Sequence, residues 1–269
     1  MQNLRIAAAM LHTPVGRLED NLAAVVAWTR RAGQAGARLI CFPEMTLTGY
    51  STRGALAGYC LSSDGPIGKT LQQLAEREAM TLLVGTAEPA PGGRVYAAHW
   101  VVQPGVPIAV YRKIHIAPPE AQALAAGDRV PVFGDEALRF GIQLCYDAHF
   151  PELSTRMAVE GADIIFIPHA SPRGTPADKF NSWMRHLTAR AFDNSAFIVA
   201  CNQTGDNGNG LHFPGVAVVI DPSGEILDND TSGREGLLIT DLKADRLTAV
   251  RGHRMRYFLP NRRPDLYLG

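Results

Sequence analysis

The sequence predicts one α/β domain in which strands and helices alternate and the sheets are mixed. The first observation is length, because 269 residues suit one large α/β domain better than two small ones. The second is composition, since 46% apolar and 19% charged residues form an ordinary globular balance. The third is rhythm: strand-sized apolar runs alternate with segments of helical period, and no linker interrupts them.

Elements of both types are marked by apolar spacing and by breakers in the first half. Leu22, Val25 and Val26 mark one face of the first expected helix, and Gly33 and Gly36 end it. The expected elements are, in order, a strand at 4–10, a helix at 18–33, a strand at 38–42, a helix at 67–80, a strand at 81–86 and a hairpin of strands at 94–103 and 106–112.

The second half repeats this alternation without being a sequence repeat. The expected elements are, in order, a strand at 138–145, a helix at 151–160, a strand at 163–168, a helix at 179–192, a strand at 196–202 and two strands at 215–220 and 237–241. The last two strands are expected to pair around the turn 221–224. The Pro-rich end has no period of its own, so the tail from about 250 to 269 is expected to pack on a neighbouring surface, within the chain or across subunits.

Charge and patterning exclude several classes of partner. The formal net charge is zero and no block of five or more Lys or Arg occurs, so no nucleic-acid partner is expected. The apolar runs are shorter than the roughly 18 residues of a membrane helix, so no membrane partner is expected. Residues 1–5 lead straight into an apolar run without a signal peptide, which indicates a cytoplasmic protein.

Four cysteines are widely spaced along the chain: Cys41, Cys60, Cys145 and Cys201. They form no C-x-x-C pair and no cluster with histidine, so no zinc site is expected. In a reducing cytosol they are expected to be free thiols. Cys41 and Cys201 lie inside apolar strands and are interpreted as core residues, whereas Cys60 lies in a Gly-rich loop without a partner motif.

Three short runs, far apart in the chain, each carry one residue of a possible catalytic set. They are FPEMTLTGY at 42–50, YRKIH at 111–115 and GIQLCYDAHFPE at 141–152. The reactive side chains would be Glu44, Lys113 and Cys145. A carboxylate, an amine and a thiol are what a cysteine-based acyl transfer needs as base, oxyanion partner and nucleophile. The order and local context of the runs resemble the nitrilase superfamily, the carbon–nitrogen hydrolases.

Cys145 is expected at a strand-to-turn junction, because a strand-like run precedes it and a helix opens after it. Such a junction lifts a nucleophile out of the sheet, and the Tyr146 N–H would point at a bound substrate oxygen as one arm of an oxyanion hole. A lone cysteine is more often an inert core residue, but the continuation YDAHFPE favours the nucleophile. Asp147 and Glu152 are expected to satisfy turn and helix-start amides.

The resemblance implies a role for the other two runs. Glu44 would be the general base that takes the Cys145 proton and later hands a proton to the leaving amine, which requires a pKa raised by burial. Lys113 would stabilise the tetrahedral oxyanion together with the Tyr146 N–H. Its charge would also favour the Cys145 thiolate by attraction. Taken alone, either residue would pass for a solvated surface charge.

A second glutamate often follows the lysine in this superfamily, ahead of an aromatic residue and a Pro-Gly pair. Spacing back from Gly127 places that glutamate at Glu120, which would position Lys113 and the substrate. The usual Phe-x-Pro-Gly is replaced here by Leu-Ala-Ala-Gly, so a surface loop glutamate is the alternative for Glu120.

The resemblance covers nearly the whole chain and implies a four-layer α-β-β-α sandwich. Because family members usually pack helices of two such units together, it also implies a homodimer or a larger homo-oligomer. The implied chemistry requires no metal and no organic cofactor.

The implied reaction is hydrolysis of a carbon–nitrogen bond other than a peptide bond, through a thioester. Nitrile-converting relatives typically carry Trp-Glu after the cysteine, and Tyr146-Asp147 here disfavours a nitrile. A small aliphatic or ω-amide that releases ammonia is favoured, and an N-carbamoyl amino acid or amine is the alternative. Arg173 is a candidate partner for a substrate carboxylate, and His169 is expected to line the same pocket.

Other interpretations have weaker support. Residues 63–70 end like a phosphate-binding loop but lack its first glycine and a preceding strand. A non-catalytic binding protein of the family would have lost a catalytic residue, and all three are present. His149 resembles the base of a Cys–His pair, but no orienting group is visible, so it is interpreted as structural or substrate-lining. The Gly-rich stretch 205–210 lacks dinucleotide-binding spacing and is expected to form a flexible loop over the site.

Overall fold

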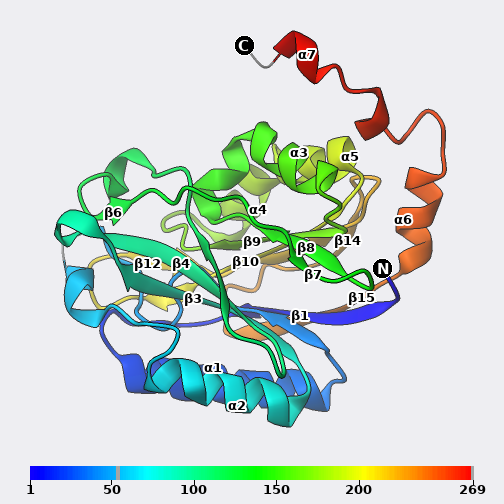
Figure 1. Ribbon diagram of the computed structural model, residues 1–269. Helices are drawn as coiled ribbons and strands as arrows, with labels where there is room; N and C mark the ends of the chain where they lie inside the picture. Colours follow the sequence, from blue (N-terminus) through cyan, green and yellow to red (C-terminus); the bar gives the residue numbers. More distant parts are fainter. Residues whose placement is uncertain (53–54, 268–269) are drawn as a thin grey trace.

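The computed structural model describes residues 1–52 and 55–267, and these form a four-layer α-β-β-α sandwich (Figure 1). Two sheets stack face to face. Helices α1 (Leu18–Gln34) and α2 (Pro66–Glu78) cover the outer face of the first sheet, while α3 (Pro151–Val159) and α5 (Leu187–Asn194) cover that of the second. The predicted α/β class and the implied layers are confirmed.

The first sheet has seven strands in the order β15-β1-β2-β3-β4-β5, with β6 paired to β4. The strands β1, β2 and β3 run parallel, and β15, β4 and β5 join them in antiparallel pairs. The bounds are β1 (Leu4–Met10), β2 (Leu39–Cys41), β3 (Thr81–Pro89), β4 (Val95–Val102), β5 (Ala109–Arg112), β6 (Leu124–Ala125) and β15 (Gly236–Leu242).

The second sheet has six strands in the order β14-β13-β10-β9-β8-β7. Their bounds are β7 (Phe133–Gly134), β8 (Arg139–Ile142), β9 (Ile164–His169), β10 (Phe197–Asn202), β13 (Ala217–Ile220) and β14 (Ile226–Asp230). A separate hairpin pairs β11 (Thr204–Asp206) with β12 (His212–Pro214). The other helical segments are α4 (Pro176–Met184), α6 (Ala244–Arg251), α7 (Pro264–Tyr267) and the short 3-10 turns η1 (Ala55–Tyr59), η2 (Pro91–Gly93), η3 (Pro118–Glu120), η4 (Cys145–His149) and η5 (Leu259–Asn261). Within the described ranges, no helix combines the length and apolar character of a transmembrane span.

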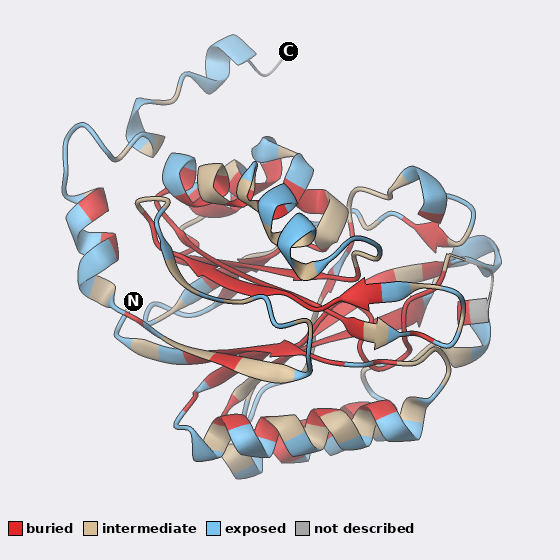
Figure 2. Ribbon diagram, turned by 180° about the vertical axis from the view of Figure 1, so that it is seen from behind, coloured by how far each residue is buried: buried red, intermediate tan, exposed pale blue. Residues whose placement is uncertain are grey.

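The first strand shows how the layers arise from the sequence. Ile6, Ala8 and Met10 pack in the core between the two sheets, whereas Ala7 and Ala9 pack in the core under α1 and α2. Because successive side chains of a strand point to opposite faces, an all-apolar run is buried on both. Figure 2 shows buried residues concentrated along the two sheets, with the helices exposing their outer sides.

The single helix predicted at 179–192 is wrong, because α4 and α5 are separate helices. Between them His186 leaves helical geometry, with φ −131° and ψ −34°. The helical period continues across this residue, so periodicity alone does not reveal the break. The break matters for the site, since it brings the His186 ring within 4.6 Å of the His149 ring.

The predicted pairing of strands 215–220 and 237–241 is also wrong. The turn 221–224 joins β13 to β14, whereas β15 pairs with β1 in the other sheet. The sequence of β14, ILDND, is mostly polar and only partly buried, so it lacks the apolar alternation that marks a strand. Helix α6, after β15, was not predicted either.

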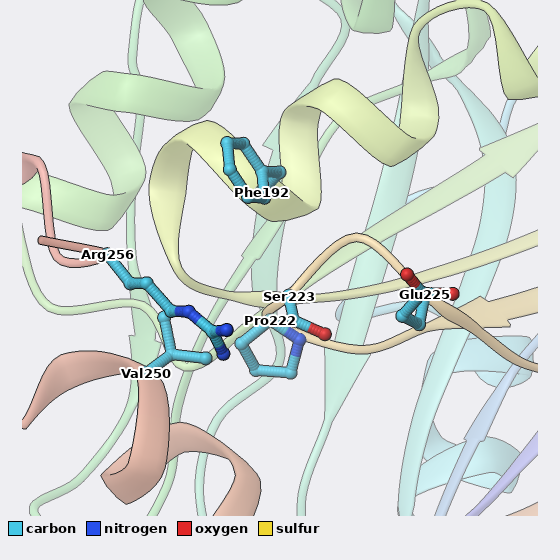
Figure 3. Close-up of a pocket in the computed structure, with 6 residues that line it drawn as sticks. All are labelled: Phe192, Pro222, Ser223, Glu225, Val250 and Arg256. Atoms are coloured by element: carbon cyan, nitrogen blue, oxygen red, sulfur yellow. The ribbon is translucent and has the colours of Figure 1, made fainter. Parts of the chain in front are cut away.

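The chain ends in a segment that leaves the sandwich after α6 (Figure 1). Its Phe258 ring lies 5.4 Å from that of Phe192 on α5. Figure 3 shows Arg256 of this segment lining a pocket together with Phe192 and residues of the turn at 221–224. The volume of this pocket is about 400 Å³. Three other apolar side chains of this segment are exposed: Met255 by 76%, Leu266 by 69% and Tyr267 by 59%. The tail therefore packs only partly on its own domain.

Candidate active site

Glu44 lies just past the end of β2 and is fully buried. The backbone around it crosses β3 at Gly85, where a Cβ atom would come within 2.3 Å of the Met45 nitrogen and 2.8 Å of the Glu44 carbonyl carbon. Only glycine allows so close an approach. The Glu44 carbonyl also accepts a hydrogen bond from Gln203 Nε2 at 2.7 Å. The loop is thus held between the first sheet and the chain that follows β10.

Lys113 follows β5 and reaches the same buried space. Its Nζ donates to Glu44 Oε1 at 2.9 Å and to both carboxylate oxygens of Glu120, at 2.8 and 2.9 Å. Glu120 also accepts from the Tyr50 hydroxyl at 2.8 Å and from the Ala117 N–H at 2.9 Å. The structure therefore brings the three predicted charged residues into direct contact, and Glu120 is buried rather than a surface glutamate.

Burial sets the protonation of this ion cluster. Removal from water raises the pKa of Glu44 to about 7, a shift that the Lys113 charge opposes and the Glu120 charge reinforces. Burial disfavours the charge on Lys113, but the two carboxylates outweigh it and raise the pKa of the ammonium. Lys113 thus stays charged, while Glu44 exchanges its proton near neutral pH.

Cys145 lies where β8 gives way to the turn η4, as predicted. Its φ of 45° places a non-glycine residue in the left-handed region, which costs about 1–3 kcal/mol. The buried Asp147 carboxylate stabilises this turn by accepting from the Leu144 N–H at 3.0 Å, the His115 N–H at 2.8 Å and the Tyr111 hydroxyl at 2.7 Å. The strained backbone is therefore fixed by contacts to the other sheet.

The Cys145 thiol lies within electrostatic reach of the ion cluster. Burial is the largest cause and raises the pKa of this thiol, and the Glu44 charge raises it further. The charges of Lys113 and Lys179 lower the pKa, but burial and the carboxylate outweigh them. The expected attraction between Lys113 and a thiolate is present, but the net effect keeps the thiol protonated. A nearby base is then required to activate the sulfur.

The segment after β9 forms another wall of the site. The Ala170 N–H donates to Glu44 Oε2 at 3.1 Å. His169 is buried, with its Nδ1–H donating to the Ile167 carbonyl at 2.6 Å and its ring stacked 4.1 Å from Trp183. Burial lowers the pKa of His169 well below its usual value, so this ring is neutral and packed in place.

Arg173 and His149 lie nearer the surface than expected for pocket residues. The Arg173 side chain is exposed, and within the described ranges no hydrogen bond or ion pair joins it to the ion cluster. His149 is exposed too, although its ring packs 5.5 Å from that of Tyr146, the residue after Cys145. The Gly-rich stretch 205–210 is a hydrogen-bonded hairpin turn, from which Asn207 Nδ2 donates to the Tyr50 carbonyl at 2.8 Å.

Three further residues near the site were not predicted. Gly85 supports the Glu44 loop, His186 packs against His149, and Lys179 on α4 carries a charge that acts on the Cys145 thiol. No sequence pattern marks them, because their position depends on contacts between distant elements. Among residues 1–52 and 55–267, no three His, Cys, Asp or Glu side chains gather as a metal-binding set.

Comparison with known proteins agrees with this geometry. The family model for carbon–nitrogen hydrolases matches residues 5–252. The chain is similar to a deaminated glutathione amidase from Synechocystis sp., with 32% identity over 262 residues that cover 91% of this chain and 94% of that protein. It is also similar to an (R)-stereoselective amidase from Pseudomonas sp., with 30% identity over 215 residues that cover 79% and 76%.

Among solved structures, the fold is similar to that of a variant of the Nesterenkonia sp. AN1 amidase in complex with butyramide. The TM-score is 0.80 at 26% identity, and the match covers 93% of this chain and 94% of that one. The chain therefore belongs to the carbon–nitrogen hydrolase family of the nitrilase superfamily.

Proposed function

We propose that the chain is a cysteine-dependent amidase that hydrolyses small aliphatic or ω-amides through a thioester and releases ammonia. The observation that carries the proposal is the buried ion cluster, in which Lys113 joins Glu44 to Glu120 beside the Cys145 thiol. A buried base, a buried cation and a protonated thiol are the parts that thioester formation needs.

In the acylation step, the Cys145 sulfur attacks the amide carbonyl carbon while Glu44 accepts the thiol proton. A C–S bond forms, and the carbonyl oxygen gains a negative charge that the Lys113 ammonium and the Tyr146 N–H stabilise. Glu44 then gives the proton to the amide nitrogen, the C–N bond breaks and ammonia leaves. A pKa near 7 suits both transfers, because such a carboxylate accepts and returns a proton at neutral pH.

In the deacylation step, water attacks the thioester carbon. Glu44 accepts a proton from the water and returns it to the sulfur, so the C–S bond breaks and the carboxylic acid leaves. Glu120 moves no proton in this scheme. Its contacts with Lys113 and Tyr50 hold the ammonium in place, so Glu120 acts as a positioning residue.

Two observations support an amide as the substrate. Both curated relatives described above are amidases, and the structural relative is in complex with butyramide, a small aliphatic amide. The exposed Arg173 side chain gives no support to its assigned contact with the carboxylate of an N-carbamoyl amino acid. The carbamoyl reaction therefore remains the second choice, to be decided by assay.

Ammonia release from a panel of amides, N-carbamoyl amino acids and nitriles tests this proposal. We expect turnover of small amides by the wild-type chain and none by Cys145→Ala. The matched control is Cys60→Ala, which removes a partly buried thiol that hydrogen-bonds to the Leu56 carbonyl and should retain turnover. Appreciable hydrolysis by Cys145→Ala, or a panel in which only nitriles react, would contradict it.

We also infer that the tail at 250–269 packs on a second copy of the chain, giving a homodimer or a larger assembly. The exposed apolar side chains Met255, Leu266 and Tyr267 support this, since they find no cover within their own protomer. Phe192 of α5, beside the start of the tail, is itself 44% exposed. A second copy would bury these surfaces together.

A further inference from the structure

The ammonium of Lys179 is held by two hydrogen bonds, within electrostatic reach of the Cys145 thiol. Lys179 is half-buried on α4, whose start is fixed by a capping box between Thr175 and Asp178. Its Nζ donates to Ser171 Oγ at 2.7 Å and to the Pro172 carbonyl at 3.1 Å. An ammonium has three N–H donors, so these two contacts leave one N–H for a further acceptor.

The contacts of Lys179 connect it to the proposed base. Its Nζ binds Ser171, and the N–H of the preceding residue, Ala170, donates to Glu44 Oε2. Ser171 is itself held by Asn202, whose side-chain oxygen accepts from the Ser171 N–H at 2.9 Å and whose amide donates to the Ser171 carbonyl at 3.0 Å. Lys179 thus stands on the wall that holds Glu44.

Among the described residues, the half-buried Lys179 is a cation without an ion-pair partner, as is the buried Arg190, whose Nε donates to the Ala148 carbonyl at 3.1 Å. Lys113 and Arg251 each bind a carboxylate, Glu44 and Asp163 respectively. Within the described ranges, Lys179 has no carboxylate within the 4.0 Å of an ion pair. A partly buried charge without a counter-ion is disfavoured, unless a bound ligand supplies the counter-ion.

The charged groups around Lys179 indicate from which side an anionic ligand would approach it. Burial lowers the pKa of Lys179, and the charge it interacts with is that of the Cys145 sulfur. The nearby rings of His149 and His186 have lowered pKa values because of burial, so they add no positive charge at neutral pH. Lys179 is therefore a positive charge within electrostatic reach of the Cys145 thiol, and it is a candidate for the role that was assigned to Arg173.

We infer that Lys179 binds an anionic group at the far end of the substrate, so that the preferred substrates are short amides that also carry a carboxylate. The inference rests on the proposed amidase function and specifies its substrate class. The carboxylate would accept the remaining N–H of Lys179 and provide the counter-ion that the chain lacks. The amide end of the same molecule would then lie at Cys145.

The test compares succinamate with butyramide, two amides with the same four-carbon chain that differ in the terminal carboxylate. We expect the wild-type kcat/KM to be higher for succinamate. Lys179→Met should lower the succinamate-to-butyramide ratio of kcat/KM by about tenfold to a hundredfold, the range for a hydrogen bond to a charged group. Lys179→Arg should restore most of the ratio, because it keeps the charge. The matched control Lys69→Met, on the exposed start of α2, should leave the ratio unchanged.

Several outcomes would overturn the inference. If Lys179→Met lowers kcat/KM equally for both amides, Lys179 holds the segment after β9 or acts on the Cys145 charge, and it does not bind the substrate carboxylate. Equal wild-type values for the two amides would also overturn it, and this measurement does not depend on whether any variant folds. Failure of the proposed function looks different, because the wild-type chain would then release ammonia from neither amide.

Discussion

Replacing Gly85 with alanine should displace Glu44 and slow turnover about a hundredfold, because a shift of about 1 Å at a reacting group has an effect of that size. Gly85 lies in β3 directly under the Glu44 loop. An added methyl group would come within 2.3 Å of the Met45 nitrogen and 2.5 Å of the Pro43 carbonyl oxygen. Both neighbours are backbone atoms, so no side-chain rotation relieves the overlap.

The size of the displacement follows from these distances. Ordinary van der Waals contact begins at 3.4 Å, so the loop must move by about 1 Å to admit the methyl group. That movement would stretch the 2.9 Å contact from Lys113 and the 3.1 Å contact from Ala170 to the Glu44 carboxylate. A hundredfold loss corresponds to about 2.7 kcal/mol of activation free energy, and overpacking adds about 1–3 kcal/mol of destabilisation.

The assay measures kcat for a small amide and the thermal unfolding midpoint on the same preparations. The matched control is Gly236→Ala in β15 of the same sheet, where the nearest atoms to an added Cβ lie at 3.7 and 3.8 Å; it should retain wild-type kcat. The reasoning is refuted if Gly85→Ala folds and keeps a kcat within a few-fold of wild type, since Glu44 would then tolerate the shift.

Three further perturbations test other parts of the site and the tail. Because Glu44 must be ionised to accept the thiol proton and its pKa is about 7, kcat/KM should rise with pH up to about 7 and then level; a flat profile between pH 5 and pH 8 would contradict its role as the base. Both carboxylate oxygens of Asp147 accept hydrogen bonds, and Asp147→Asn leaves only one acceptor oxygen. The variant should therefore destabilise the fold by about 1–3 kcal/mol, measured by calorimetry, and lower kcat, measured by ammonia release. Unchanged values would mean that the turn holds Cys145 without this carboxylate. Removing residues 253–269 should reduce the number of subunits in the native particle, measured by light scattering; an unchanged number would show that the tail does not join subunits.

Local pattern was enough to predict elements whose burial is uniform. The strand at 4–10 was predicted with the bounds of β1, since every residue from Ile6 to Met10 is apolar and buried. Pattern failed where local and tertiary signals disagree. The polar strand β14 is held by pairing with β13, and the break at His186 leaves the helical period intact.

The same distinction applies to the candidate site. Glu44, Lys113 and Cys145 were predicted because each lies in a run that resembles a family motif, and Glu120 followed from spacing to Gly127. The structure adds contacts between them that no run encodes, such as the shared ammonium of Lys113.

The residues that sequence reasoning missed act through space. Gly85 is one of 26 glycines, and its importance is visible only when the Glu44 loop lies across it. Lys179 resembles any solvated helix lysine until its contacts with Ser171 and Pro172 are seen. Arg173 was chosen because it lies in the polar stretch 169–173 that follows a strand end, and Lys179 was not considered.

The carboxylate of Glu44 is gripped from both sheets, by Lys113 from the first and by the Ala170 N–H from the second. A cut in the exposed turn between β7 and β8, near residue 136, would leave Glu44 and Lys113 on one fragment and Cys145 on the other. Neither fragment would carry the complete set of proposed catalytic residues. Turnover would then return only when the two fragments reassemble, so ammonia release would itself measure fragment complementation.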